Sequence, residues 1–223
     1  MKSEIIKTAD GSHTLFVKEL NEQYHSVNGA ITESMHVFIT NAFLFRNKNS
    51  TTVFEVGFGT GLNCLLTAIK ANELHIKIKY ISVEKYPLKD NLIKQLNYSS
   101  IIGSNSGDIW QKIHHADWNN EVQISDSFKL HKLKLDLTAC TFPETLSKFD
   151  VIYFDAFAPD IQPEMWQPEI FNILAENCNS SAVITTYSAK GEVRRKMMAS
   201  GFKMEKLPGP PGKKEMLRGI ITN

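Results

Sequence analysis

Apolar and polar positions along this chain follow several distinct patterns, and each change of pattern marks an element. Near the N-terminus, apolar residues gather in 4–8 and 13–19, on either side of Asp10-Gly11. An Asp-Gly pair between two apolar runs predicts a tight β-hairpin. Over 30–46 the apolar residues instead recur three and four positions apart, which predicts a helix.

From residue 51 onward, short apolar runs alternate with longer amphipathic segments. The predicted strands are 51–56, 76–83, 122–124, 128–135, 151–154, 182–186, 202–207 and 216–221. The predicted helices are 62–71, 88–96, 164–176 and 190–199, whereas 98–120 shows no clear pattern. This alternation predicts an α/β fold with a doubly wound, mostly parallel sheet, helices on both faces and an antiparallel edge hairpin. We expect an N-terminal extension over 1–47 and one larger domain over 48–223.

The composition is that of an ordinary globular protein. The 223 residues are 42% hydrophobic and 22% charged, which excludes a wholly disordered chain. Cys64, Cys140 and Cys178 are far apart and form no CxxC pair, so we expect neither a disulfide framework nor a bound metal. The first residues lack the apolar core of a signal peptide, and no window approaches the roughly 18 apolar residues of a membrane span. These features predict a cytoplasmic protein without a membrane segment.

Charge is distributed unevenly along the chain. Residues 190–223 contain nine basic and three acidic side chains, whereas acidic residues outnumber basic ones in the rest of the sequence. Two interpretations stay open at this point. The basic residues form a solvated helix face and a charged loop, or they form a local patch that faces the phosphates of a nucleic acid.

A glycine-rich loop follows the strand predicted at 51–56. In FEVGFGTGLN, Gly57, Gly59 and Gly61 let the backbone turn tightly and let a ligand approach closely. The spacing is GxGxG, and Leu62 stands where the dinucleotide fingerprint GxGxxG requires its third glycine. With Glu55 in front of the loop, the pattern favours S-adenosylmethionine, whose ammonium and sulfonium groups suit nearby carboxylates, over NAD or FAD.

Acidic residues end four consecutive predicted strands: Glu55, Glu84, Asp136 and Asp155. The carboxyl ends of strands in an open α/β sheet surround the crevice where ligands bind. Glu84 is expected to accept hydrogen bonds from the ribose hydroxyls of the cofactor, and Asp136 to reach its adenine amine. Each acid alone could equally be a helix cap or a turn residue. Together with the glycine loop they predict a cofactor site, which we extend to the neighbouring Asn63 and Lys85.

Several longer stretches resemble a known family: FEVGFGTGLN, ISVEKYPL, FDVIYFDAFAPDIQPEMW, TTYSAKGEVRR and GPPGKKEMLRG. They are similar to the methyltransferase that completes 5-methylaminomethyl-2-thiouridine in tRNA, and the stretch DGSHTLFVKELNEQYHSVNGAITESMHVFI resembles the front end of that family. The resemblance implies the Rossmann-like class I S-adenosylmethionine-dependent methyltransferase fold. It also implies methylation of the primary amine of 5-aminomethyl-2-thiouridine at the tRNA wobble position.

In many bacteria this methyltransferase is the amino-terminal half of a bifunctional enzyme whose other half is a flavin oxidase. The present sequence stops at Asn223, so the resemblance is to a stand-alone form. We therefore expect a separate flavin oxidase to act in the same pathway. The match is weakest over 98–135, which makes the assignment of Asp136 to the adenine the least supported part of the resemblance.

The resemblance also implies roles for residues around the DAFAP segment. Asp155 is the candidate to accept a proton from the substrate amine and to orient it. Phe157 and Trp166 are expected to form an aromatic wall that stacks on the uracil ring, with Pro159 stiffening the loop between them. The alternatives are that Asp155 bonds loop amides at the strand end and that Trp166 anchors a helix in the core.

Two further groups of residues are expected to contact the tRNA. The resemblance places Tyr24 and His25 near the cleft, in an N-terminal extension that acts as a lid, although a lone histidine is more often structural. Phosphates near the anticodon loop would be held by basic residues of the last third of the chain. These are Lys190, Arg194, Arg195, Lys213 and Lys214.

Two other functions remain to be distinguished from this one. The same fold serves methyltransferases and aminopropyltransferases that act on small-molecule amines, because fold does not fix function. The basic C-terminal stretch argues against them. A non-enzymatic RNA-binding adaptor could also retain a relic of the cofactor fold, but the intact glycine loop and its acidic neighbours argue against that.

Overall fold

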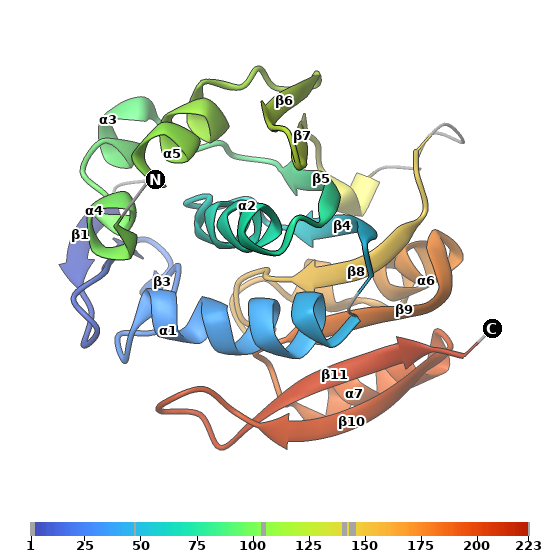
Figure 1. Ribbon diagram of the computed structural model, residues 1–223. Helices are drawn as coiled ribbons and strands as arrows, with labels where there is room; N and C mark the ends of the chain where they lie inside the picture. Colours follow the sequence, from blue (N-terminus) through green and yellow to red (C-terminus); the bar gives the residue numbers. More distant parts are fainter. Residues whose placement is uncertain (1–2, 47, 104–105, 140–141, 143–145, 223) are drawn as a thin grey trace.

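The computed structural model describes residues 3–46, 48–103, 106–139, 142 and 146–222, which form two sheets (Figure 1). The smaller sheet has the strand order β1-β2-β3 and the larger one the order β10-β11-β9-β8-β4-β5-β7-β6. The smaller sheet comprises β1 (Ser3–Lys7), β2 (His13–Val17) and β3 (Glu22–Gln23). The larger comprises β4 (Ser50–Val56), β5 (Lys77–Glu84), β6 (Glu121–Ser125), β7 (Phe128–Lys134), β8 (Phe149–Phe154), β9 (Cys178–Thr186), β10 (Phe202–Pro208) and β11 (Glu215–Ile221).

The central strands are parallel and the edges are antiparallel. β4 pairs in parallel with β5 and β8, and the parallel ladder continues to β7 on one side and to β9 on the other. The hairpin β10–β11 adds to β9 in antiparallel orientation, and β6 adds antiparallel to β7 at the opposite edge. The predicted doubly wound sheet with an antiparallel edge hairpin is confirmed.

Helices cover both faces of this sheet (Figure 1). One face packs against α1 (Ala30–Ser34), the π-helical segment η1 (Met35–Leu44), α2 (Leu62–Leu74) and α5 (Ser106–His115), and the other against α6 (Pro168–Glu176) and α7 (Gly191–Ala199). Successive strand residues point to opposite faces, so Val53 joins the first apolar cluster and Phe54 the second. Both side chains are fully buried, as expected for a strand covered on both faces.

The N-terminal hairpin is held against the helix that follows it. Asp10, in the predicted turn, accepts hydrogen bonds from the backbone N–H of Thr32 at 2.9 Å and from its hydroxyl at 2.8 Å. Leu15 of the hairpin belongs to the same apolar cluster as Val53 of the large sheet. The extension therefore shares a core with the larger domain, and the division at residue 47 stays a prediction.

The structure differs from the sequence-based elements in several places. The predicted helix 88–96 is limited to α3 (Asp90–Ile93), and the predicted helix 164–176 is divided into the 3-10 segment η3 (Pro163–Trp166) and α6. Pro168 causes this division, because the residue before a proline favours an extended backbone and Gln167 has ψ 154°. The segment without a clear pattern contains α4 (Tyr98–Ile102) and α5.

A long-range contact stabilises the end of α5. The buried ammonium of Lys132, on β7, donates to the carbonyl oxygens of Ile113 and His114 at 2.9 and 3.3 Å. A cation at a helix C-terminus satisfies the carbonyl groups that have no partner within the helix. None of the helices in the described ranges is long and apolar enough to cross a membrane.

Candidate active site

A cavity of about 600 Å³ opens where β4, β5, β7 and β8 end. This is the edge of an open α/β sheet at which ligands bind. The smaller sheet, α1 and the loop between β10 and β11 complete its wall. Polar and aromatic side chains on this wall include Glu22, Tyr24, His25, Glu33, Asn63, Glu84, Lys85, Asp136, Asp155, Phe157, Tyr187 and Lys213.

The glycine loop joins β4 to α2 in left-handed backbone conformations. Gly57 and Gly59 lie on the cavity wall with φ of 88° and 51°. A Cβ on Gly57 would lie 2.8 Å from the backbone oxygen of Asp155, and one on Gly59 would lie 3.1 Å from the Tyr24 ring. Gly61 differs from its expected role as a cofactor contact: it precedes α2 with φ 79° and faces Phe58 and His114. Its need for glycine is conformational and steric.

Glu84 ends β5 directly opposite the glycine loop. Its Oε2 accepts a hydrogen bond from the backbone N–H of Gly59 at 3.1 Å, and its Oε1 accepts one from Tyr86 at 2.8 Å. A carboxylate has about four acceptor positions. Glu84 is therefore fixed in place and retains capacity to accept further hydrogen bonds from a ligand in the cavity.

Asp136 and Lys85 form an ion pair next to Glu84. Lys85 Nζ lies 2.7 Å from Oδ2 of Asp136, while Oδ1 accepts hydrogen bonds from the backbone N–H and the hydroxyl of Thr138 at 3.0 and 2.6 Å. The Lys85 hydrogen bond holds the pKa of Asp136 below its usual range. Asp136 is thus a turn acid that also lies on the cavity wall, and its contact with adenine stays a prediction.

Asp155 follows β8 on the inner wall of the cavity. Its backbone N–H donates a hydrogen bond to the carbonyl oxygen of Val56, and its Oδ2 accepts a hydrogen bond from Nδ2 of Asn63 at 2.8 Å. Burial raises the pKa of Asp155 to about 7, and the charge of Glu33 acts in the same direction, against the Asn63 hydrogen bond and the charge of Lys213. A carboxyl group with this pKa can both accept and release a proton at neutral pH.

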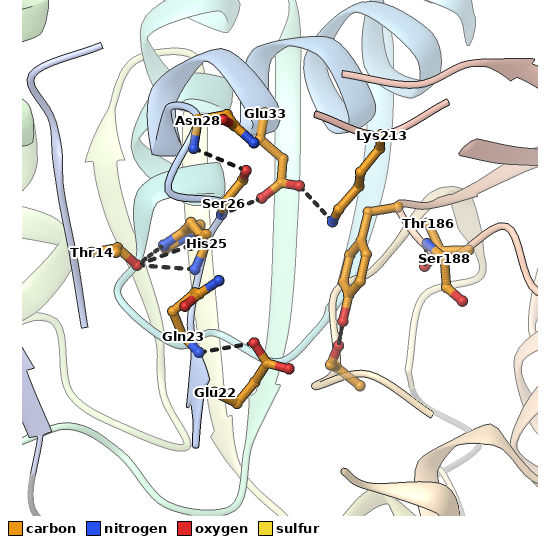
Figure 2. A network of polar contacts seen from close by, with 12 residues as sticks. Thr14, Glu22, Gln23, His25, Ser26, Asn28, Glu33, Thr186, Ser188 and Lys213 are labelled. Atoms are coloured by element: carbon orange, nitrogen blue, oxygen red, sulfur yellow. Dashed lines mark hydrogen bonds and ion pairs between the residues drawn. The ribbon is translucent and has the colours of Figure 1, made fainter. Parts of the chain in front are cut away.

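An ion pair between Glu33 and Lys213 joins two parts of the cavity wall (Figure 2). Lys213 Nζ lies 2.7 Å from Oε1 of the buried Glu33, whose Oε2 accepts a hydrogen bond from the Ser26 N–H at 2.8 Å. The same ammonium lies 3.8 Å from the centre of the Tyr187 ring, and the Tyr187 hydroxyl donates to the Ala156 carbonyl. The expectation that Lys213 holds tRNA phosphate does not fit this placement, because its charge is engaged inside the cavity.

The aromatic residues near Asp155 have different surroundings. Phe157 and Tyr24 face each other on the cavity wall with ring centres 5.1 Å apart. Trp166 is only 1% exposed, and its Nε1 donates to the backbone oxygen of Phe157 at 2.8 Å. The expected stacking of Trp166 on the substrate does not fit this burial, which agrees with the alternative of a core anchor. Pro159 lines a separate, smaller hollow.

His25 is a buried side chain on the cavity wall, next to the end of β3. Its backbone N–H donates to the Thr14 hydroxyl at 3.0 Å, and its ring nitrogens lie 3.5 Å from the hydroxyls of Thr14 and Thr60. Burial lowers the pKa of His25 to about 4, so the ring is neutral at physiological pH. These contacts agree with the structural interpretation that the sequence favoured.

Glu55 does not lie on the cavity wall. Its side chain is 0% exposed beneath the glycine loop, and its Oε2 accepts a hydrogen bond from the Ser82 hydroxyl at 2.6 Å. The expectation that it is a direct cofactor ligand does not fit this position. The sequence pattern located the residue at the strand end but could not show that its side chain turns into the protein.

The remaining basic residues lie on α7 and the β10–β11 loop. Lys190 pairs with Asp160, whereas Arg195 and Lys214 are exposed and form no ion pair within the described part of the chain. Lys214 and the partly buried Arg194 both lower the pKa of Glu215, after the stronger effect of its hydrogen bond from Lys206. The two elements therefore bring their positive charges together. Among the described residues, no group of three or more potential ligands is arranged to hold a metal ion.

A glycine loop, an acid at the end of the next strand and a cofactor-sized cavity indicate a cofactor site of an α/β enzyme. Comparison with known families decides which enzyme class this is. The model of a family described as S-adenosyl-L-methionine-dependent methyltransferase matches residues 105–222. The chain belongs to this family. It is a methyltransferase, and its cofactor is S-adenosyl-L-methionine.

The names of individual relatives are more specific than the description of the family. The chain is 32% identical over 216 residues to the tRNA 5-methylaminomethyl-2-thiouridine biosynthesis bifunctional protein MnmC of Pseudomonas syringae pv. syringae. This alignment covers 92% of the present chain and 32% of that protein. It is 30% identical over 208 residues to the protein of the same name from Burkholderia thailandensis, covering 88% and 32%. The chain thus spans about a third of the length of these curated relatives.

Two solved structures show the same architecture. MnmC2 from Aquifex aeolicus superposes with a TM-score of 0.81 at 25% identity, covering 98% of this chain and 70% of the other. Spermidine synthase from Thermotoga maritima has a TM-score of 0.56 at 11% identity, over 99% of this chain and 72% of the other. The second match shows a shared fold alone.

Proposed function

We propose that this methyltransferase acts on the primary amine of 5-aminomethyl-2-thiouridine at the wobble position of tRNA and forms 5-methylaminomethyl-2-thiouridine. The observation that carries the proposal is Asp155, a carboxyl group with a pKa of about 7 on the inner wall of a cofactor-sized cavity. The names of the curated relatives refer to the biosynthesis of 5-methylaminomethyl-2-thiouridine in tRNA, and removing the transferred methyl group from that product gives the proposed substrate.

The cavity fits S-adenosylmethionine in size and in chemistry. Sites for ligands of this class typically enclose about 300–1,000 Å³, and the cavity has about 600 Å³. Gly57 and Gly59 present bare backbone where a Cβ would collide with facing atoms. Glu84 retains acceptor capacity for ribose hydroxyls, and Asp136 with Lys85 lies beside it for the adenine end. When bound, the cofactor supplies an electrophilic methyl group on its sulfonium.

Asp155 prepares the acceptor amine. An alkyl amine is mostly protonated at neutral pH, as the lysine side chain is, and only the free base is a nucleophile. Asp155 accepts the proton and holds the amine by a hydrogen bond, while Asn63 keeps the carboxyl group in one orientation. Fixing the reacting groups in line contributes several kcal/mol, because the entropy of alignment is lost on binding rather than in the transition state.

The aromatic pair on the cavity wall suits an unstacked base. Tyr24 and Phe157 place two rings at the cavity, and RNA-modifying enzymes commonly stack splayed-out bases on such side chains. A wobble base already lies in a loop, so extruding it costs less than flipping a paired base. Glu33, Lys213 and Tyr187 complete the polar side of the same space.

The exposed cations outside the cavity suit the tRNA backbone. Arg195 and Lys214, with Lys190 and Arg194 beside them, would contact phosphates and so supply affinity without reading sequence. A flavin oxidase that prepares the aminomethyl group in the same pathway stays a prediction.

Nucleoside analysis after incubation with labelled S-adenosylmethionine tests the proposal. Hypomodified tRNA that carries 5-aminomethyl-2-thiouridine should yield labelled 5-methylaminomethyl-2-thiouridine, whereas tRNA lacking the aminomethyl group should stay unlabelled. Equal methylation of the free nucleoside would instead favour a small-molecule enzyme. Cofactor binding without any transfer would favour an RNA-binding adaptor.

A further inference from the structure

Three polar atoms beneath the glycine loop are buried and lack a hydrogen-bond partner within the described residues. They are Oε1 of Glu55, Oδ1 of Asn63 and the hydroxyl oxygen of Tyr80. The three side chains are 0%, 3% and 0% exposed, respectively. They belong to one cluster, because Asn63 and Tyr80 both lie close enough to the Glu55 carboxyl to lower its pKa. Buried polar groups without partners are rare and costly, so this cluster requires a physical account.

The contacts of Asn63 determine which way its amide points. Nδ2 donates to Oδ2 of Asp155 at 2.8 Å, so the amide nitrogen faces Asp155 and the amide oxygen is left in need of a donor. An ionised Glu55 has no proton to give to this amide oxygen, which then conflicts with its need for a donor. A protonated Glu55 has an O–H group and removes the conflict without any change in the backbone.

We propose that Glu55 is a neutral carboxylic acid in the resting enzyme and is a positioning residue for Asp155. Its Oε1–H donates to Oδ1 of Asn63, which fixes the amide so that Nδ2 donates to Asp155. The neutral acid thereby keeps the second carboxyl group oriented and favours its ionised form. Glu55 acts through Asn63 and does not touch the cofactor.

Burial is the strongest influence on Glu55 and favours the neutral form, whereas the hydrogen-bonding groups of Ser82, Asn63 and Tyr80 favour the ionised one. Its other oxygen, Oε2, accepts a hydrogen bond from the Ser82 hydroxyl at 2.6 Å. The carbonyl oxygen of a neutral acid can accept this hydrogen bond as well as a carboxylate oxygen can. The titratable groups that act on Glu55 or are acted on by it are Tyr80 on β5, Cys64 on α2, Tyr153 on β8 and Asp155. None of these groups is a cation, so nothing in this set compensates a buried negative charge.

Electrostatics between the two carboxyl groups point the same way. Burial and the Asp155 charge together raise the pKa of Glu55 to about 8, against the hydrogen-bonding groups of Ser82, Asn63 and Tyr80, whereas burial raises the pKa of Asp155 to about 7. Two acids this close lose their protons in sequence rather than together. Glu55 is sealed beneath the glycine loop whereas Asp155 faces the cavity, so the proton stays on Glu55 while Asp155 accepts one from the substrate amine. Only this last consequence rests on the proposed function.

Carboxyl ¹³C NMR of the wild-type protein, labelled at glutamate, tests the protonation state directly and needs no tRNA. We expect one glutamate carboxyl signal to titrate near pH 8, and that signal to be absent from Glu55→Gln. An ordinary glutamate titrates near about 4.3. If every glutamate signal titrates in that ordinary range, the proposal is overturned, whether or not any variant folds.

Two substitutions of Glu55 separate positioning from cofactor binding. Glu55→Gln retains an N–H donor for Asn63, so its dissociation constant for S-adenosylmethionine should stay within about two-fold of wild type and most of its turnover should survive. Glu55→Leu removes the donor and should lose about ten-fold or more in kcat with little change in cofactor affinity. If Glu55→Gln weakens cofactor binding about ten-fold, Glu55 is an ionised ligand and the proposal is wrong. Cofactor binding and NMR titration stay interpretable even if tRNA is not the substrate.

Discussion

Lys213 and Glu33 form an ion pair of 2.7 Å across 180 residues of sequence. The pair joins α1 to the β10–β11 loop at the cavity wall, and the Lys213 ammonium also covers the Tyr187 ring. Both charges reach Asp155: Glu33 raises the pKa of that carboxyl group and Lys213 lowers it. The N-terminal extension and the C-terminal hairpin therefore both shift the pKa of a residue that neither element contains, in addition to the larger effect of burial.

Removing either member of this pair should shift the pH dependence of the reaction. Lys213→Met deletes the charge that lowers the pKa of Asp155, so the acid limb of kcat/KM should move to higher pH. Glu33→Gln should move the same limb to lower pH, because it deletes the charge that raises this pKa. Profiles of both variants that coincide with wild type would show that the pair does not act on Asp155.

Cofactor binding should depend on the space at Gly59. Its φ of 51° is unfavourable for a residue with a side chain, and a Cβ would meet the Tyr24 ring at 3.1 Å. Gly59→Val should therefore abolish binding of S-adenosylmethionine in calorimetry. Gly107→Ala is the matched control, because a Cβ at that position would meet no atom within 4 Å, and it should bind as wild type does. Normal binding by Gly59→Val would contradict the role of the loop.

Glu84 should contribute to cofactor affinity and little to chemistry. Glu84→Ala removes a fixed carboxylate acceptor from the cavity wall, and hydrogen bonds to charged groups contribute about 1.5–3 kcal/mol. We expect the dissociation constant for S-adenosylmethionine to rise by about 10–100-fold. Glu73→Ala, an exposed acid on α2 paired with Lys70, serves as the control. An unchanged constant in Glu84→Ala would exclude the ribose contact.

Much of the fold was predictable because its signals are local. Buried apolar runs such as 151–154 indicate central strands, and the glycine loop marks the start of α2 whatever surrounds it. The position of Asp155 at a strand end followed from the same alternation. In the parallel sheet, that position was enough to place it at the ligand-binding edge.

The site predictions that do not fit the structure depend on contacts between segments that are distant in the sequence. Phe157 and Trp166 belong to one sequence motif, but only the tertiary packing decides that Phe157 lines the cavity and Trp166 enters the core. Lys213 and Lys214 are adjacent, and contacts with the buried Glu33 and the Tyr187 ring hold only the first at the cavity. Glu33 and Tyr187 lie within stretches of sequence that resemble the methyltransferase family. No sequence pattern around either residue indicated a role in the active site.

The salt dependence of tRNA affinity should identify the residues that bind phosphate. Replacing Arg195 and Lys214, which are exposed and outside the cavity, by Ala should reduce the log–log salt slope by about 1 for each phosphate that the variant no longer binds. Lys18→Ala, on the surface after β2, should leave the slope unchanged. A slope equal to that of wild type in the double variant would make these residues ordinary surface charges.

Asp155 is the residue on which the proposed function depends most directly. The decisive measurement is kcat of Asp155→Asn on tRNA that carries 5-aminomethyl-2-thiouridine, with the dissociation constant for S-adenosylmethionine determined on the same preparation. Asp126→Asn, an exposed acid in the β6–β7 turn, is the control. We predict a fall in kcat of about 10²–10⁴-fold in Asp155→Asn with cofactor affinity nearly unchanged, as expected for loss of a general base. Turnover close to that of wild type would contradict the proposed role of Asp155.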